Sequence, residues 1–201
     1  TSGGDCQALN AAMRGVAKSL YNKIPDVKIY GFLDGYKGLI NNNCKVMNVD
    51  DFSGILTIGG TILGTSRTPF KKITEPDKLP EISDDRETYE KIFEILRELN
   101  ISYFFYIGGN DSMDTIKKLS DYAIVTGSDI KFMGVPKTID NDLVGTDVSF
   151  GFQSAVDIAT STIDCQSFFS KSYCDIRVKM YFATNWYIWI ATLLRNSRNP
   201  L

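Results

Sequence analysis

The sequence contains no histidine among its 201 residues. This absence excludes a Ser-His-Asp triad, a histidine-ligated zinc site and the usual general base near neutral pH. Any proton transfer must therefore use a carboxylate, lysine, tyrosine or cysteine side chain. Cysteine is scarce as well, because only Cys6, Cys44, Cys165 and Cys174 are present and no two form a Cys-x-x-Cys pair. This spacing indicates no zinc site, and we interpret the four residues as reduced thiols of an intracellular protein.

The chain also lacks a charge bias and a long apolar run. Lysine and arginine number 22, aspartate and glutamate number 24, and the formal net charge is −2. A nucleic-acid-binding protein needs a basic surface, so we expect no nucleic-acid partner. The longest uncharged apolar stretch, Met180–Leu194, is shorter than the ~20 residues that span a bilayer. Thr1 starts in a glycine turn rather than a signal peptide, so we expect no membrane partner.

What the sequence does contain is a regular alternation of helical and strand patterns. Hydrophobic residues make up 43% of the chain, which is enough for a packed core. Apolar residues at three- and four-residue spacing predict helices, and short β-branched and aromatic runs predict strands. The predicted helices cover residues 9–20, 50–55, 83–99, 112–122, 150–163 and 186–195. The predicted strands cover residues 27–32, 101–107, 131–135 and 177–183, with turns at 35–38 and 136–145 and a loop at 65–80.

Strand, glycine turn and helix in series predict an α/β fold, in which helices cover both faces of a parallel sheet to give an αβα sandwich. The best domain boundary lies near Gly145. We therefore expect one α/β domain at residues 1–144 and the start of a second α/β domain at residues 145–201.

Three glycine turns, Gly3-Gly4, Gly59-Gly60 and Gly108-Gly109, are each expected to precede a helix. The N–H groups at a helix N-terminus favour an anion, and three such turns in one α/β chain indicate phosphate or polyphosphate binding. Asn110, Asp111 and Ser112 follow the third turn, where we expect them to cap the next helix.

Two polar segments carry the remaining chemistry. Arg67 lies in a loop with Lys71 and Lys72, and its guanidinium matches the geometry of phosphate oxygens. The segment Pro136–Asp142 contains two carboxylates, Asp140 and Asp142, and Lys137. One carboxylate can take a proton from a substrate hydroxyl, the other can hold Mg²⁺, and the lysine can contact phosphate oxygens.

Together these residues resemble the phosphofructokinase family. The resemblance rests on Thr-Ser-Gly-Gly-Asp at 1–5, Gly-Gly-Asn-Asp-Ser at 108–112 and Pro-Lys-Thr-Ile-Asp-Asn-Asp at 136–142. It continues through segments 9–15, 31–38, 59–67 and 145–152 in the family's order, and covers the chain to about Ile163. The related lipid and NAD kinases share a glycine turn but not the segment 136–142.

The resemblance implies phosphoryl transfer to the 1-hydroxyl of fructose 6-phosphate, giving fructose 1,6-bisphosphate in glycolysis with Mg²⁺ as cofactor. By resemblance, Asp140 is the general base and Arg67 contacts the transferring phosphoryl group, with Lys137 as a third catalytic residue. The residues implied to bind the sugar substrate are Thr138, Asp140, Asp142 and Arg177. Those implied to bind the phosphoryl donor are Gly4, Gly109, Asp111, Ser112 and Lys137, and those implied at the metal are Asn110 and Asp142. The family further implies that residues 1–144 form the phosphoryl-donor-binding domain and that residues 145–201 are the partial start of the sugar-phosphate-binding domain. It also implies a cytoplasmic homo-oligomer.

Two residues favour pyrophosphate over ATP as the phosphoryl donor. ATP-using members of the family commonly have glycine where Asp111 and Lys137 stand. Asp111 would repel the α-phosphate of ATP, and Lys137 would pair with pyrophosphate, so the sequence resembles the pyrophosphate-dependent branch. An ATP-dependent enzyme is the first alternative.

The sequence departs from the family's pattern at three points. Asn110 stands where a metal-binding aspartate is usual. The family's first strand and most of its second half are not represented, which would leave unpaired sheet edges and apolar surface. After Ile163 the Glu and Met-Gly-Arg that hold the sugar phosphate have no counterpart. We therefore interpret the chain as a fragment or degraded copy of a pyrophosphate-type phosphofructokinase that is inactive alone. A non-catalytic phosphate-binding protein and an unstable product are the further alternatives.

Overall fold

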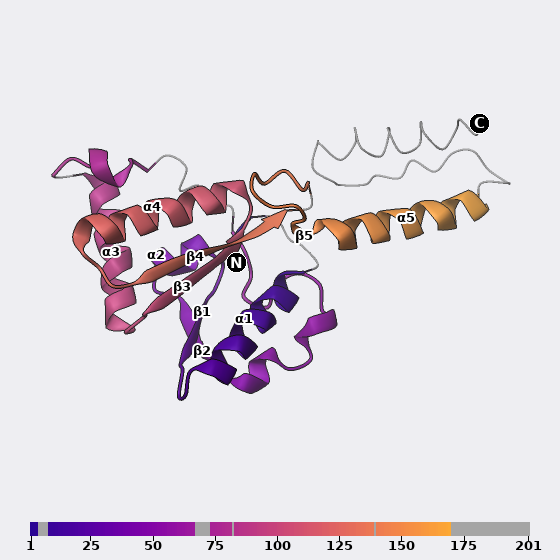
Figure 1. Cartoon of the computed structure of the whole chain (residues 1–201), viewed down its shortest axis with the longest axis horizontal. Helices are drawn as coiled ribbons and strands as arrows, with labels where there is room; N and C mark the ends of the chain where they lie inside the picture. Colours follow the sequence, from indigo (N-terminus) through magenta and orange to yellow (C-terminus); the bar gives the residue numbers. More distant parts are fainter. Residues whose placement is uncertain (4–7, 67–72, 82, 139, 170–201) are drawn as a thin grey trace.

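A computed structural model describes residues 1–3, 8–66, 73–81, 83–138 and 140–169, and gives side chains as far as residue 161. Its main sheet has three parallel strands in the order β3 (Tyr103–Gly108), β4 (Lys131–Thr138) and β5 (Phe150–Gly151). Helix α4 (Asn110–Thr126) connects β3 to β4, as a parallel pair requires (Figure 1). The predicted α/β fold with a parallel sheet is confirmed for this part of the chain.

The amino-terminal strands form a separate antiparallel pair. β1 (Ile29–Phe32) pairs with β2 (Cys44–Met47), so the predicted strand at 27–32 does not join a parallel series. β2 was not predicted, because four residues that include a lysine show no β pattern long enough to recognise. Between the two strands, the predicted turn at 35–38 is helix α2 (Tyr36–Ile40), which begins directly after Gly35 at a φ of 58°.

The two clearest helical patterns are confirmed. α1 spans Leu9–Lys23 and α3 spans Asp84–Glu98. Ser83 caps α3 as predicted, because its side chain accepts a hydrogen bond from the Arg86 backbone N–H at 3.2 Å. Within the described ranges, short 3₁₀ helices occur at Val49–Phe52, Ile55–Thr57 and Pro76–Lys78. The first two replace the single predicted helix at 50–55.

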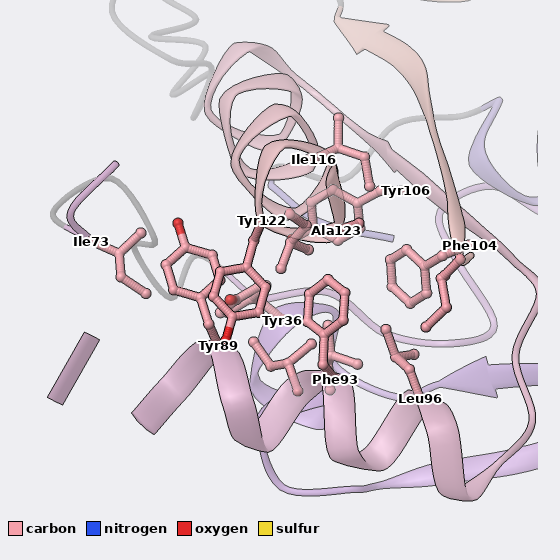
Figure 2. Close-up of a cluster of buried hydrophobic side chains, with 14 residues drawn as sticks. Tyr36, Ile73, Tyr89, Phe93, Leu96, Phe104, Tyr106, Ile116, Tyr122 and Ala123 are labelled. Atoms are coloured by element: carbon pink, nitrogen blue, oxygen red, sulfur yellow. The ribbon is translucent and has the colours of Figure 1, made fainter. Parts of the chain in front are cut away.

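A cluster of buried hydrophobic side chains packs against each face of strand β3. Phe104 and Tyr106 point into a cluster formed with α3 and α4, where the rings of Tyr89 and Tyr122 stack with centroids 4.6 Å apart (Figure 2). Ile107 points to the other face, into a cluster with α1 and β2. Each buried side chain of this size contributes roughly 1.5–3 kcal/mol. Helices packed against both faces give the αβα arrangement that the alternation predicted.

A cavity of about 630 Å³ lies between the edges of β1 and β3 and beneath α1. Its walls include Met13, Phe32, Met47 and Phe105. Thr1 also lines the cavity, and the backbone N–H of the next residue, Ser2, donates to the Ile107 carbonyl at 2.9 Å.

The carboxyl-terminal part of the described chain differs from expectation in two details. β4 continues through Pro136 to Thr138, so the polar loop begins later than predicted. The predicted helix at 150–163 is preceded by β5 and runs as α5 (Phe152–Phe169), which extends away from the sheet (Figure 1). The predicted strand at 177–183 and helix at 186–195 lie outside the described residues, and the domain division stays a prediction. No helix within the described ranges is long and apolar enough to cross a membrane.

Candidate functional site

The first glycine turn joins the end of β3 to the loop after the second turn. The Gly3 N–H donates to the Ser66 carbonyl at 3.2 Å, and the Thr65 hydroxyl donates to the Gly3 carbonyl at 2.7 Å. The Thr1 hydroxyl donates to the Gly64 carbonyl at 2.7 Å. Residues sixty positions apart therefore form one surface at the carboxyl end of β3, where ligands of parallel α/β folds bind. Gly4 lies outside the described residues.

The prediction that a helix follows the second turn is wrong for the residues described. No helix begins between Gly59 and Ser66; the chain instead folds back through Gly60, at a φ of 74°. Asn10, which is fully buried in α1, fixes this turn. Its amide nitrogen donates to the Ile58 carbonyl at 2.9 Å and its amide oxygen accepts from the Ile62 N–H at 2.8 Å. Of the three turns, this one supplies a shaped loop rather than a helix N-terminus.

The third turn does open a helix. Gly109 is the N-cap of α4, so Asn110, Asp111 and Ser112 are its first three helical residues and not its capping side chains as predicted. The first N–H groups of a helix favour an anion, and in α4 the Ser112 N–H also donates to the Gly109 carbonyl at 2.9 Å. Ser112 is buried against Gly108, which brings the start of α4 close to the end of β3. Because Asn110 does not cap, its side chain is available for another contact.

That contact joins α4 to the segment after β4. The Asn110 amide nitrogen donates to one carboxylate oxygen of Asp142 at 3.2 Å. The Thr138 hydroxyl donates to the other oxygen at 3.2 Å and accepts from the Asp140 backbone N–H at 3.0 Å. Strand β4 places Thr138, which is buried, while both carboxylates remain exposed. The two acidic residues predicted for the site therefore share one hydroxyl anchor.

Asp140 has the electrostatic environment of a base. Partial desolvation raises its pKa, the neighbouring carboxylate of Asp142 raises it further, and Lys137 opposes both effects. A raised pKa brings a carboxylate closer to the pH at which it exchanges protons efficiently.

Lys137 is the buried cation of the site, with 6% of its surface exposed. Its Nζ lies 3.6 Å from the position that a Cβ on Gly3 would occupy, and its carbonyl oxygen lies 3.4 Å from the corresponding position on Gly109. Lys137 therefore lies between the first and third glycine turns. A cation beside helix-start amides favours a phosphate group.

The structure thus brings together seven of the predicted site residues: Gly109, Asn110, Ser112, Lys137, Thr138, Asp140 and Asp142. Asp111 is exposed in the same first turn of α4. Arg67, Arg177 and Gly4 lie outside the described residues, so their placement stays a prediction. Sequence reasoning did not single out Asn10, Asn141 or Ser149, which shape the loops of the site, because an asparagine or serine in a polar turn carries no distinctive spacing.

The side chains of the site could supply Mg²⁺ with one or two ligands, but not with a complete coordination shell. Within the described part of the chain, no group of three or more Cys, Asp and Glu side chains is placed to hold a metal ion. Mg²⁺ usually takes one or two carboxylates, keeps several waters and uses the substrate's phosphate oxygens for the rest. The exposed carboxylate of Asp142 meets that requirement. Asn110 contacts Asp142 through its nitrogen, and its carbonyl oxygen is the end that a cation would use.

Comparison with known protein families identifies the family of this chain. The family model described as phosphofructokinase matches residues 1–179. The chain belongs to the phosphofructokinase family. Helix α4, the glycine turns and the Lys137–Asp142 segment are therefore parts of a phosphofructokinase scaffold.

Relatives of both donor types are similar to this chain. The ATP-dependent 6-phosphofructokinase of Spirochaeta thermophila is 46% identical over 165 residues, which cover 82% of this chain and 42% of that protein. The pyrophosphate–fructose 6-phosphate 1-phosphotransferase of Amycolatopsis methanolica is 39% identical over the same shares. The crystal structure of the pyrophosphate-dependent phosphofructokinase from Marinobacter aquaeolei has a TM-score of 0.64 and 33% identity, covering 82% of this chain and 39% of its own. This phosphofructokinase chain spans about two fifths of the length of these curated relatives.

Proposed function

We propose that this chain forms the donor side of a 6-phosphofructokinase that transfers a phosphoryl group from pyrophosphate to the 1-hydroxyl of fructose 6-phosphate. The observation that carries the proposal is the meeting of Lys137, the start of α4 and the Asp140–Asp142 pair at one edge of the parallel sheet. Phosphoryl transfer depends mainly on positioning and electrostatic stabilisation, which such an arrangement supplies. Family membership supports the reaction class.

Different residues accept the proton and bind the phosphate groups. Asp140 takes the proton of the 1-hydroxyl as the sugar oxygen attacks the transferred phosphoryl group, whose bond to the bridging oxygen breaks and releases orthophosphate. Lys137 and the first N–H groups of α4 hold phosphate oxygens of the donor, and Gly3 and Gly109 leave room for the phosphate close to the backbone. Mg²⁺, when bound, neutralises negative charge on the phosphates. Asp142 and Asn110 would hold it, as the sequence predicts.

Thr138 and the residues outside the described ranges complete the proposal. Thr138 is assigned to the sugar substrate by resemblance, and its hydroxyl is hydrogen-bonded to the Asp140 backbone N–H and the Asp142 carboxylate. Arg67 is assigned to the transferring phosphoryl group and Arg177 to the sugar phosphate, both by resemblance. A homo-oligomer of two-domain subunits in the cytoplasm is proposed on the same ground.

The choice of donor rests on charge. Asp111 places a carboxylate in the first turn of α4, where the phosphates of a nucleotide would lie, and Lys137 is buried beside the Gly3 turn. A fixed negative charge disfavours the longer, more highly charged nucleotide, while a lysine favours a compact diphosphate. ATP is the second candidate, because the 46% identical relative is named ATP-dependent.

The activity test measures fructose 1,6-bisphosphate formation from fructose 6-phosphate and Mg²⁺, with pyrophosphate and ATP in parallel. Turnover with pyrophosphate that is lost in Asp140→Asn supports the proposal. If a folded chain binds pyrophosphate but turns over neither donor, a non-catalytic phosphate-binding role replaces it.

The donor test uses the double variant Asp111→Gly with Lys137→Gly. Removing the repelling carboxylate and the lysine that pairs with pyrophosphate should shift the ratio of kcat/KM values toward ATP by at least about tenfold, since each tenfold step needs only ~1.4 kcal/mol. A ratio equal to that of the wild type would refute the assignment of donor choice to these two residues. The Asn100→Gly variant, at the opposite end of β3, is the matched control.

A further inference from the structure

The segment that carries both acidic residues is closed by a hydrogen-bonded brace. Asn141 lies between Asp140 and Asp142 at a φ of 53°, in the left-handed region that asparagine tolerates better than most residues. Its amide oxygen accepts from the Ser149 backbone N–H at 2.8 Å. Its amide nitrogen donates to the Asp147 carbonyl at 3.4 Å. One side chain thus connects the centre of the acidic turn to the chain eight residues later.

Ser149 carries the brace down to the sheet. It is 1% exposed, and its hydroxyl lies 3.0 Å from both the Thr138 carbonyl and the Asn141 amide oxygen. A hydroxyl has one proton, so it donates to one of these oxygens at a time. The backbone N–H of Ser149 holds Asn141 in either case. Thr138, whose own hydroxyl anchors Asp140 and Asp142, is thereby fixed from both its backbone and its side chain.

We propose that Asn141 and Ser149 are positioning residues, which fix the acidic turn so that Asp140 and Asp142 are held at the separation the reaction needs. Neither side chain has to touch substrate for this. Both carboxylates are exposed on a turn, and without the brace each would sample several orientations. Displacing a reacting group by about 1 Å costs on the order of 100-fold in rate, so a brace of this kind acts on kcat. The inference rests on the proposed function.

The test compares Asn141→Gly, Ser149→Ala and Asn100→Gly. Glycine keeps the left-handed backbone at Asn141 and removes only the side chain. Asn100 has the same φ of 53° and lies in the loop before β3, at the opposite end of that strand, so its variant is the matched control. We expect the first two variants to lose about 10- to 100-fold in kcat, with KM values for both substrates within about threefold of wild type. The control should keep the wild-type kcat.

Wild-type kcat in both Asn141→Gly and Ser149→Ala, or a raised KM with unchanged kcat, would overturn the proposal. A second readout separates it from the proposed function: Mn²⁺ affinity in the presence of pyrophosphate, followed by electron paramagnetic resonance. If the wild-type chain binds Mn²⁺ but gives no turnover, the proposed function fails for this chain. The brace then stands if Asn141→Gly and Ser149→Ala weaken Mn²⁺ binding about tenfold more than Asn100→Gly. Equal affinities, or no Mn²⁺ binding by the wild type, overturn it.

Discussion

Substituting alanine for Gly108 should separate the two elements that build the donor site. A Cβ on Gly108 would lie 2.2 Å from the Ser112 Oγ, 2.5 Å from the Ser112 Cβ and 3.1 Å from the Ser2 carbonyl oxygen. Carbon atoms in contact need about 3.5 Å, so the start of α4 must move away from β3 by about 1 Å. Overpacking of this kind costs roughly 1–3 kcal/mol. In a chain of this length that corresponds to a melting temperature lower by about 2–12 °C.

The same displacement has a consequence for ligand binding. It would carry the first N–H groups of α4, and with them Asn110, away from Lys137 and Asp142. We therefore expect Gly108→Ala to weaken pyrophosphate binding at least about tenfold, because the helix start and the lysine must contact the same anion. Circular dichroism melting and isothermal titration calorimetry measure the two effects separately.

Two further variants make the reasoning refutable. Adding Ser112→Gly to Gly108→Ala removes both of the closest atoms and should recover most of the lost stability, apart from the ~1 kcal/mol cost of glycine in a helix. Gly15→Ala lies in α1 with no atom within 4 Å of its Cβ, and should raise stability by about 0.5–1 kcal/mol. If Gly108→Ala melts at the wild-type temperature and binds pyrophosphate normally, the close packing of α4 on β3 is refuted.

The remaining predictions concern pH. The pKa of Asp140 is raised, so the folded protein holds this proton more tightly than the unfolded chain, and the resulting stabilisation at low pH is lost as pH rises through the folded pKa. Asp142→Asn should lower the pKa of Asp140, seen as a lower midpoint in its carboxyl ¹³C titration without Mg²⁺; an unchanged midpoint would show that the two carboxylates do not interact. Hydrogen bonds from the Thr74 hydroxyl and backbone N–H lower the pKa of Asp85. Its contribution to the stability of the fold is therefore present above the pKa of the unfolded chain and is lost as pH falls through the pKa of the folded protein. Asp85→Asn should therefore reduce the acid-induced fall in the free energy of unfolding below about pH 4, measured by urea denaturation; the same fall in both proteins would contradict it.

Local patterns predicted the elements whose signal lies within a few residues of each other. The apolar spacing of α1 and α3 and the Ser83 cap are confirmed, because helix periodicity and capping are properties of neighbouring residues. The segment Pro136–Asp142 was identified as a whole for the same reason. Strand β2 was missed, since a four-residue edge strand is defined by its partner β1 rather than by its own composition.

Tertiary structure decided how the predicted residues are used. The sequence pattern predicted a helix after Gly59-Gly60, whereas the buried side chain of Asn10, 48 positions from Ile58, fixes that turn by hydrogen bonds. The sequence pattern also predicted that Asn110 caps α4, whereas in the folded chain its amide nitrogen donates to Asp142, 32 positions away.

Composition and motifs by themselves determined the family, the parallel α/β class and the residue types available for chemistry, since these depend on local order and on what the chain lacks. Only the folded chain decided that Lys137 is buried between two glycine turns, and that Asn141 and Ser149 brace the acidic residues. Such contacts depend on distances between segments that are remote in sequence. Packing of the helices on β3 sets those distances, and no local pattern encodes them.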